Sequence, residues 1–456
     1  MVIKLNISEL LFEFLIMFGM GLFAYINSSV GQVLLICVLG IWITNKILKN
    51  KYSLYELLVL VVVGLFVGSN YLLYFGIVIN AIYIGVVKKG LNLKVDLEVI
   101  GFAVMLVSGS ISSFLYAVDK KAAYQYIFIY FLLFLFLWES KIVNQKIVIK
   151  ESTAVSFFSM SSFLLGIGFF LTHTFKELQS LFRMEIFYNL RKGVGANTLA
   201  GIMAPFLFGC MLIVIESKDR KSRLISFLAV VTIAPILLTI QSRGVYLGIF
   251  IAVVWILLSE RSPKVIVTSI CFSILAIFIF FNNPNIFARF FGRFSSVVRR
   301  TGNSLNGRER LYKIAWDMFK EHPIIGNGFW QFGVNGITES DPHNFILAYL
   351  ASTGIIGGVG FLLYLTAVYI RLRATLKRRI NASKLLCEII IVSYIIFVVH
   401  GCVEPSMTTQ APLSIFILMT LLPVRTEMYS GREDHFKLVE GLVHDARTTN
   451  KDVTAK

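Results

Sequence analysis

One histidine stands at the start of an apolar helix, where it could act as a base. His343 lies in the segment DPHN, which leads directly into the apolar run FILAYLASTGIIGGVGFLLYL. The positive end of the helix dipole there disfavours imidazolium, which helps to keep the ring neutral and able to accept a proton. A histidine at a helix start can also be an ordinary interface residue, and its position alone leaves both roles open.

Arg308 opens a segment, RERLYKIAWDMFK, that predicts an amphipathic helix ending before Pro323. One stripe of this helix is apolar and the opposite face is charged. Arg308 falls on the apolar side, where a charge near a membrane surface is costly unless it is paired. It is therefore a candidate phosphate ligand, because guanidinium fits phosphate oxygens, and the alternative is a side chain that snorkels to water.

Other arginines stand at the ends of expected membrane spans or in the basic link that precedes Arg308. Arg191 lies in NLRKGVGANTLAG and Arg243 in QSRGVYLG, each close to a glycine. Arg243 sits where two apolar runs meet almost without a loop, so it lies either at the water line or within a cavity. Arg289 and Arg293 begin the basic cluster of the link, which indicates an anionic partner, either a substrate or acidic lipid headgroups.

The elements that must position these side chains are transmembrane helices. Of 456 residues, 57% are hydrophobic and only 15% charged. Apolar stretches of roughly 17 to 25 residues can each cross a hydrocarbon core as a helix. The sequence therefore predicts an all-α integral membrane protein of roughly 12–14 transmembrane helices with a large extracytoplasmic loop containing an amphipathic helix. The expected spans are 8–25, 30–48, 54–69, 71–87, 97–117, 123–138, 153–171, 198–215, 224–240, 244–259, 265–281, 343–370, 385–403 and 409–424.

Charge in the links predicts the orientation of these helices. The net charge is +17, but the basic residues lie mostly in short links between apolar runs. They therefore indicate the orientation of the helices in the membrane and not a surface that binds nucleic acid. Alternate links are basic, which predicts both termini in the cytoplasm and leaves the links 172–197 and 282–342 outside. The five cysteines are scattered singly, so we expect neither a disulfide framework nor a zinc site.

The chain is expected to divide into three parts. Residues 1–190 would form N-terminal transmembrane helices, and residues 191–424 a membrane domain that includes the outer loop 282–342. Residues 425–456 are polar and mixed in charge, and we expect a cytoplasmic tail. The domain with the outer loop holds all the candidate site residues.

These segments together resemble the O-antigen ligase and O-antigen polymerase family, bacterial glycosyltransferases with many membrane helices. The key match is HNFILAYLASTGIIGG, in which His343 and Asn344 are followed by nine residues, Gly354, two residues and Gly357. The stretch NGRERLYKIAWDMFKEHPIIGNGFWQF and the SRG around Arg243 are similar as well. The close resemblance covers roughly residues 190 to 365.

The resemblance implies a metal-independent reaction without a cofactor, at the outer face of the bacterial cytoplasmic membrane. Arg243 and Arg308 would bind the pyrophosphate of an undecaprenyl-linked glycan and stabilise the leaving group, and His343 would take the proton of the acceptor hydroxyl. Further substrate contacts are expected from one set of residues: Arg191, Asn344, Arg289 and Arg293.

Three functions remain open at this point. The favoured one is a polymerase of lipid-linked repeat units for O-antigen or capsule, with membrane lipids, a flippase and a chain-length regulator as partners. The alternative is a ligase that moves glycan to lipid A core or another acceptor. A transporter of lipid-linked sugars is disfavoured, because carriers usually need paired ionisable groups at mid-membrane, and Glu13 and Glu388 have no evident partner in the sequence.

Overall fold

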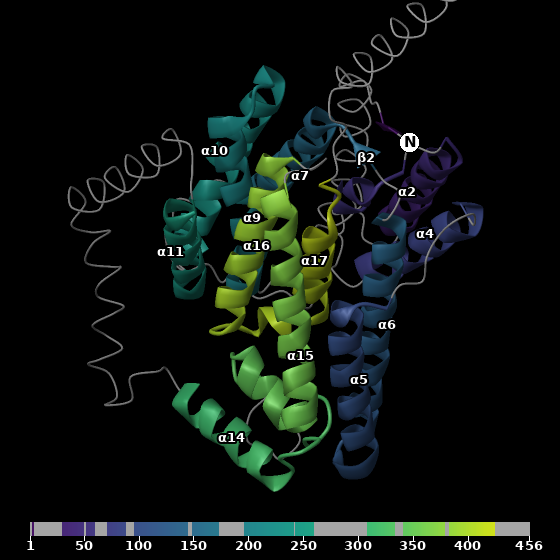
Figure 1. Ribbon diagram of the computed structural model, residues 1–456, viewed down its shortest axis with the longest axis vertical. Helices are drawn as coiled ribbons and strands as arrows, with labels where there is room; N and C mark the ends of the chain where they lie inside the picture. Colours follow the sequence, from purple (N-terminus) through teal and green to yellow (C-terminus); the bar gives the residue numbers. More distant parts are fainter. Residues whose placement is uncertain are drawn as a thin grey trace, which may run out of the picture.

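The computed structural model describes eleven stretches of the chain, and in these the protein is a bundle of helices (Figure 1). The described residues are 2–3, 30–49, 52–59, 71–87, 95–144, 148–172, 196–240, 242–259, 308–332, 341–378 and 383–424. The helices are α2 (Val30–Leu48), α4 (Tyr71–Val87), α5 (Leu97–Tyr116), α6 (Lys120–Asn144), α7 (Glu151–Thr172), α9 (Ala196–Glu216), α10 (Arg220–Ile240), α11 (Arg243–Leu258), α14 (Arg308–Glu321), α15 (Phe345–Arg378), α16 (Lys384–Gly401), the 3-10 turn η2 (Pro405–Met407) and α17 (Gln410–Leu421). Two strands of two residues each, β1 (Val2–Ile3) and β2 (Val148–Ile149), pair in parallel.

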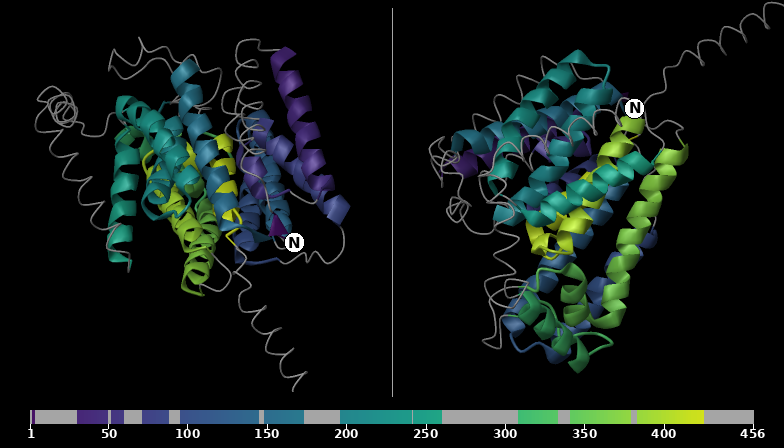
Figure 2. Two further views of the ribbon diagram at one scale, coloured as in Figure 1. Left: turned by 90° about the horizontal axis from the view of Figure 1, so that it is seen from above. Right: turned by 90° about the vertical axis from the view of Figure 1, so that its left-hand side faces the viewer.

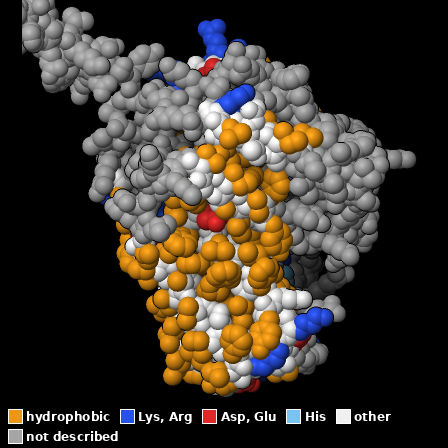
Figure 3. Space-filling view, turned by 90° about the vertical axis from the view of Figure 1, so that its right-hand side faces the viewer, with side chains coloured by type: hydrophobic (Ala, Val, Ile, Leu, Met, Phe, Trp, Pro, Cys, Tyr) orange, Lys and Arg blue, Asp and Glu red, His pale blue; other side chains and the backbone are white. Residues whose placement is uncertain are grey.

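The helices coincide closely with the expected membrane spans, and the all-α membrane fold is confirmed. Six described helices are long and apolar enough to cross a membrane, and three shorter ones are apolar as well. Of the other expected spans, 8–25 and 265–281 lie outside the described residues, and 54–69 is described only over the helical residues 54–59. Figure 3 shows hydrophobic side chains gathered over one face of the bundle, where α5 and α6 expose many large apolar residues.

Close helix contacts hold the bundle together. α5 lies against α15, where a Cβ on Gly101 would come within 2.6 Å of the backbone nitrogen of Tyr364. On the other side of the molecule α16 packs against both α9 and α11, and α10 packs against α7 and α9 (Figure 1). α14 lies across one end of the bundle, beside the start of α15 (Figure 2).

α14 has the amphipathic character predicted for it. Ala315 is buried, and the other members of the apolar stripe are half-buried, whereas the opposite face is exposed. The helix ends at Glu321, directly before the turn that contains Pro323. The described part of the link 282–342 thus carries a surface helix, with Arg308 as its first residue.

α15 is broken at Gly354, which a continuous span over 343–370 did not anticipate. Gly354 has φ +64°, a left-handed conformation that favours glycine. The turn after α14 supplies the hydrogen bonds that the break removes: the N–H of Ile355 and of Ile356 donate to the carbonyls of Pro323 and Ile324 at 2.9 and 3.1 Å. We call this joint between residues 323–328 and the break in α15 the clip.

The clip fixes α14 relative to the first turns of α15. In the other direction, the N–H of Asn327 and of Gly328 donate to the carbonyls of Ala351 and Ser352 at 3.0 and 2.9 Å. Backbone approaches here are too close for a side chain: a Cβ on Gly354 would lie 2.3 Å from the carbonyl oxygen of Ile324. The two sequence motifs around Arg308 and His343 are therefore locked to each other.

Candidate functional site

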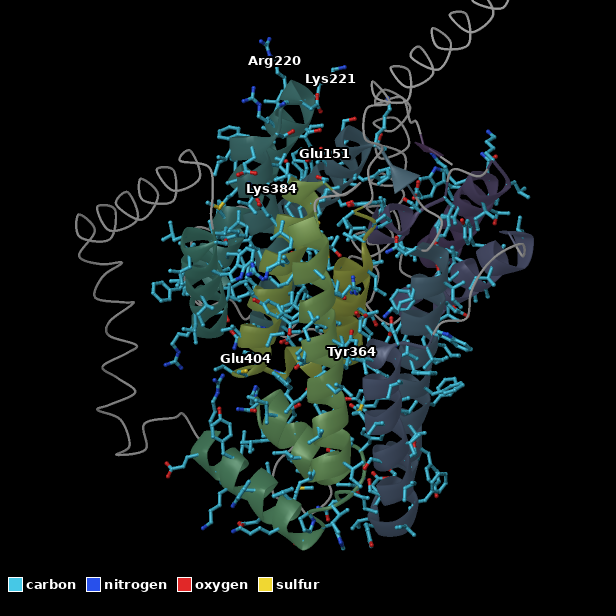
Figure 4. The ribbon with its side chains drawn as sticks, viewed as in Figure 1. Glu151, Arg220, Lys221, Tyr364, Lys384 and Glu404 are labelled. Carbon is cyan, nitrogen blue, oxygen red and sulfur yellow. The ribbon has the colours of Figure 1, made fainter. Side chains whose placement is uncertain are left out.

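The site is built around Glu404, in the short loop that follows α16. Figure 4 places Glu404 at one end of α16, near the start of α14, with Lys384 at the other end of the same helix. The carboxylate is almost buried, with 6% of the side chain exposed. Side chains from three other segments of the chain reach it.

Two polar side chains donate to one oxygen of Glu404. Nη2 of Arg308 lies 2.6 Å from Oε1 and forms an ion pair with it, and Nδ2 of Asn197 donates to the same oxygen at 2.9 Å. Arg308 is the first residue of α14, and Asn197 belongs to the first turn of α9. The ion pair explains how Arg308 can lie on the apolar side of α14, because the carboxylate of Glu404 compensates its charge.

His343 approaches the second oxygen of the same carboxylate. Its Nδ1 lies 3.3 Å from Oε2 of Glu404, although the two groups are not aligned for a straight hydrogen bond. Hydrogen bonds of catalytic groups are often long or poorly aligned before substrate binds. About a quarter of each basic side chain remains exposed, 28% for His343 and 26% for Arg308. A candidate base and a candidate phosphate ligand therefore lie side by side and reach the surface.

The charge of Glu404 is stabilised by these neighbours. Burial raises the pKa of the Glu404 carboxyl, but His343 and Arg308 beside it outweigh burial, and the pKa lies below its ordinary value. The carboxylate is therefore ionised at neutral pH. It supplies one fixed negative charge between the arginine and the imidazole.

A buried aspartate sets the backbone at His343. His343 has φ +54°, which is uncommon for a residue with a side chain. Oδ1 of Asp341 accepts the N–H of His343 at 2.6 Å, and its other oxygen accepts the hydroxyl of Thr408. Burial raises the pKa of the Asp341 carboxyl above its usual value. Because Thr408 follows Glu404 by four residues, Asp341 connects the backbone at His343 to the loop that carries Glu404.

Asn344 has a structural task as well as the predicted substrate contact. Its Oδ1 accepts the N–H of Ile346 and of Leu347 at 3.0 and 3.2 Å, so it caps the first turn of α15. The side-chain oxygen is thus used within the protein. Only the amide NH₂ of Asn344 is left for a ligand.

The segment with Arg243 packs directly against the glutamate loop. A Cβ on Gly244 would lie 2.5 Å from Cγ2 of Val403 and 3.7 Å from Cγ of Glu404. Arg243 is the first residue of α11, and its side chain is exposed. Of the two positions predicted for Arg243, the structure shows the exposed one, next to the site.

His400 joins the helices that meet behind the glutamate. It is buried in the last turn of α16, and a Cβ on Gly201 of α9 or on Gly244 of α11 would touch its ring. Nδ1 of His400 lies 3.0 Å from Oγ of Ser406. The close approach of α9, α11 and α16 at this ring holds the segments that carry Asn197, Arg243 and Glu404.

Three of the predicted site residues, Arg191, Arg289 and Arg293, lie outside the described residues. The structure brings together His343 and Arg308, and it places Arg243 close to them in the fold. Within the described residues there is no group of three or more His, Cys, Asp or Glu side chains that could hold a metal ion.

Glu404, Asp341 and Asn197 are members of the site that the sequence interpretation missed. The signal for Glu404 was its place in HGCVEPS, a single acidic residue directly after an apolar run. One further expectation was wrong: Glu388 does have a partner, because Nζ of Lys384 lies 3.7 Å from its Oε1, one helical turn away. The lack of a partner at Glu388 therefore no longer counts against a transporter, although the pair lies in the first turns of α16 and not at its middle.

The comparison with protein families covers the part of the chain that holds these residues. Residues 227–362 match the family described as O-antigen ligase, and this range includes Arg243, Arg308 and His343. The match covers less than half of the chain, and it shows that this segment is similar to the family. This similarity points to a glycosyl-transferring enzyme that acts on a lipid-linked glycan and an acceptor. No curated protein matches the chain.

The similarity to the O-antigen ligase family agrees with the many apolar helices of the protein. Its apolar helices make it a multi-pass membrane protein. The histidine and the arginine converge on one carboxylate at the end of α16, within reach of the matched segment.

Proposed function

We propose that the protein is a polymerase of lipid-linked oligosaccharide repeat units on the outer face of the cytoplasmic membrane. The observation that supports it most is the convergence of Arg308 and His343 on one carboxylate, inside the matched O-antigen ligase segment. A phosphate ligand and a proton acceptor side by side are what transfer from a glycan diphosphate requires.

In the proposed reaction a hydroxyl of the acceptor glycan attacks the anomeric carbon of the donor. A new carbon–oxygen bond forms there as the bond to the diphosphate oxygen breaks, and its electron pair leaves with undecaprenyl diphosphate. Nε2 of His343 takes the hydroxyl proton. Arg308 and Arg243 bind the departing diphosphate, with Arg191, Arg289 and Arg293 as further contacts, and Asn344 contributes its amide NH₂ to the acceptor.

The reaction is proposed to need no divalent metal. Guanidinium groups stay charged at all relevant pH values and offer several donors to phosphate oxygens, so they can balance the charge of the leaving group. Turnover of a purified preparation with lipid-linked donor should therefore survive addition of EDTA.

The proposed orientation puts the site outside. Arg220, Lys221 and Lys384 gather at the end of the bundle opposite Glu404 (Figure 4), and basic ends face the cytoplasm in most membrane proteins. With both termini inside, residues 1–190 would be the N-terminal membrane helices, 191–424 the catalytic membrane domain and 425–456 a cytoplasmic tail. A flippase and a chain-length regulator would be its partners.

A ligase is the second candidate, because the matched family carries that description. It would use the same donor chemistry and transfer glycan to lipid A core or another acceptor. The two functions differ in the product that is lost when the enzyme fails.

Gene deletion with complementation separates the two candidates. We expect a deletion strain to show single-repeat product on a glycan gel, with ladders restored by the wild-type chain but not by His343→Ala or Arg243→Ala at equal membrane levels. Long undecaprenyl-linked chains left unattached would indicate the ligase, and normal ladders from both variants would overturn the site.

A further inference from the structure

A carboxylate such as Glu404 is unexpected beside a group that binds diphosphate. A fixed negative charge repels the phosphates that Arg308 is proposed to bind. Yet the carboxylate is almost buried and ionised, and both of its oxygens face basic groups. Its presence in this position therefore calls for a function that outweighs the repulsion.

Resting on the proposed function, we infer that Glu404 is a positioning residue that orients both the base and the phosphate ligand. Its Oε2 faces Nδ1 of His343 at 3.3 Å, and its Oε1 holds Nη2 of Arg308 at 2.6 Å. A carboxylate at Nδ1 favours the tautomer with the proton on Nδ1, which leaves Nε2 with a free lone pair for the acceptor hydroxyl.

The same carboxylate compensates the charge that the reaction creates. When Nε2 takes the proton of the acceptor, His343 becomes imidazolium, and the negative charge of Glu404 at Nδ1 stabilises it. No proton needs to reach Glu404 itself. In the free enzyme this charge is shared with Arg308, so binding of a diphosphate at Arg308 would leave Glu404 to act more fully on the imidazole.

Arg308 can serve Glu404 and a phosphate together. The ion pair involves Nη2, and a guanidinium carries donors on all three nitrogens. Glu404 thus holds the group in place by one nitrogen while Nη1 and Nε remain available. Asn197, which donates to the same carboxylate oxygen at 2.9 Å, fixes the glutamate in turn.

Nuclear magnetic resonance can test the orienting role without any activity measurement. In detergent-solubilised protein with ¹⁵N-labelled histidine, the ring signals of His343, identified by their absence in His343→Gln, should show the proton on Nδ1 at neutral pH. In Glu404→Gln the proton should move to Nε2. A proton on Nε2 already in the wild-type protein, or unchanged tautomers in the variant, would overturn the inference.

Turnover of a lipid-linked donor tests what the orientation does. Glu404→Gln should lower kcat by on the order of 100-fold with the acceptor KM within about threefold, and Glu404→Asp should recover part of kcat. The matched control is Glu98→Gln, which removes another buried carboxylate with two basic partners and should leave kcat within about threefold.

The outcomes separate the inference from the proposed function. If the wild-type protein turns over no lipid-linked glycan but the tautomer shifts as expected, the proposed function fails and the orienting role stands. If kcat of Glu404→Gln stays within about threefold of wild type, or falls no further than that of Glu98→Gln, the role of Glu404 is structural and the inference is wrong.

Discussion

Two buried glutamates, each between two basic side chains, lie near opposite ends of α17, and they differ in what surrounds them. Glu404 precedes α17 and contacts Arg308 and His343. Glu98, at the start of α5, forms ion pairs with Lys141 at 2.8 Å and with Arg371 at 2.5 Å. Arg371 also donates to the carbonyl of Thr420 near the end of α17, at 3.0 Å.

The Glu98 cluster is closed, whereas the Glu404 cluster is open. We call the former closed because Glu98 and its two basic partners all stand on long helices; Lys141 is 13% exposed and Arg371 32%. In the latter, His343 has a left-handed backbone, and Glu404 lies in the loop between α16 and α17. Ion pairs between rigid helices, as in the Glu98 cluster, hold those helices together. A cluster at helix ends and beside a strained backbone, as around Glu404, can receive a ligand.

Removing one arginine from each cluster gives the largest expected contrast. Arg308→Gln should lower turnover of the lipid-linked donor by about 10²–10³-fold, because a charge that stabilises the leaving group is lost. Its free energy of unfolding should also fall, by about 2–3 kcal/mol, because the buried carboxylate of Glu404 loses its ion pair, so kcat is taken for the folded fraction. The measurements are kcat and thermal unfolding of the purified protein in detergent.

The matched variant in the other cluster is Arg371→Gln. It should reduce the free energy of unfolding by about 2–3 kcal/mol, because Glu98 then keeps one basic partner of two. The turnover of the folded fraction should remain close to that of the wild type. Equal losses of kcat in the two variants would mean that the contrast between the clusters is wrong.

The next largest effect concerns the clip, on which the open cluster depends. Gly354→Ala puts a Cβ 2.3 Å from the carbonyl oxygen of Ile324 at φ +64°, so we expect a loss of about 2–3 kcal/mol in unfolding free energy. Activity should fall with it, because the clip joins the helix of Arg308 to that of His343.

Gly358→Ala, one turn further along α15, is the control for this variant. Its Cβ would meet only the end of the Leu350 side chain, at 2.9 Å, and that side chain can turn away. We expect a stability and a kcat close to the wild-type values. Thermal unfolding of both variants checks this, and similar melting temperatures for the two would show that the break in α15 is not held as described.

Helix positions were predictable from the sequence because the hydrophobic signal is local. The run from residue 343 onward predicted α15, and the stripe of RERLYKIAWDMFK predicted α14, since each pattern depends only on neighbours in the chain. The break at Gly354 was not predictable in this way. Its lost hydrogen bonds are replaced by residues 323 and 324, some thirty positions earlier.

The candidate site was half predictable for the same reason. His343 and Arg308 stood out by type and by place on a helix, and the family resemblance linked them. Glu404 is about sixty residues beyond His343 and is marked only as a single acidic residue after an apolar run, and Asp341 is a common residue in a loop, so no local pattern linked either one to the site. Their roles come from the packing of α9, α11 and α16, which brings a loop after one helix to the start of two others.

The smallest expected effect is a difference in pH dependence among three carboxyls, measured as thermal unfolding between pH 7 and pH 3. A carboxyl whose pKa is lowered in the folded state adds stability above its unfolded pKa of about 4, and that stability is lost as the pH falls through the folded value. The pKa of Glu404 is lowered in this way. Burial also raises the pKa of Asp96, but its ion pair with Lys141 outweighs burial. The stability advantage of the wild type over Glu404→Gln or Asp96→Asn should therefore shrink near pH 4, by less than about 1 kcal/mol.

Asp341, whose pKa burial raises, should behave oppositely: the wild type should gain stability relative to Asp341→Asn as the pH falls. If the stability effect of Asp341 changed with pH in the same direction as that of Glu404, burial beside His343 would not be raising the pKa of Asp341. The open cluster would then resemble the closed one.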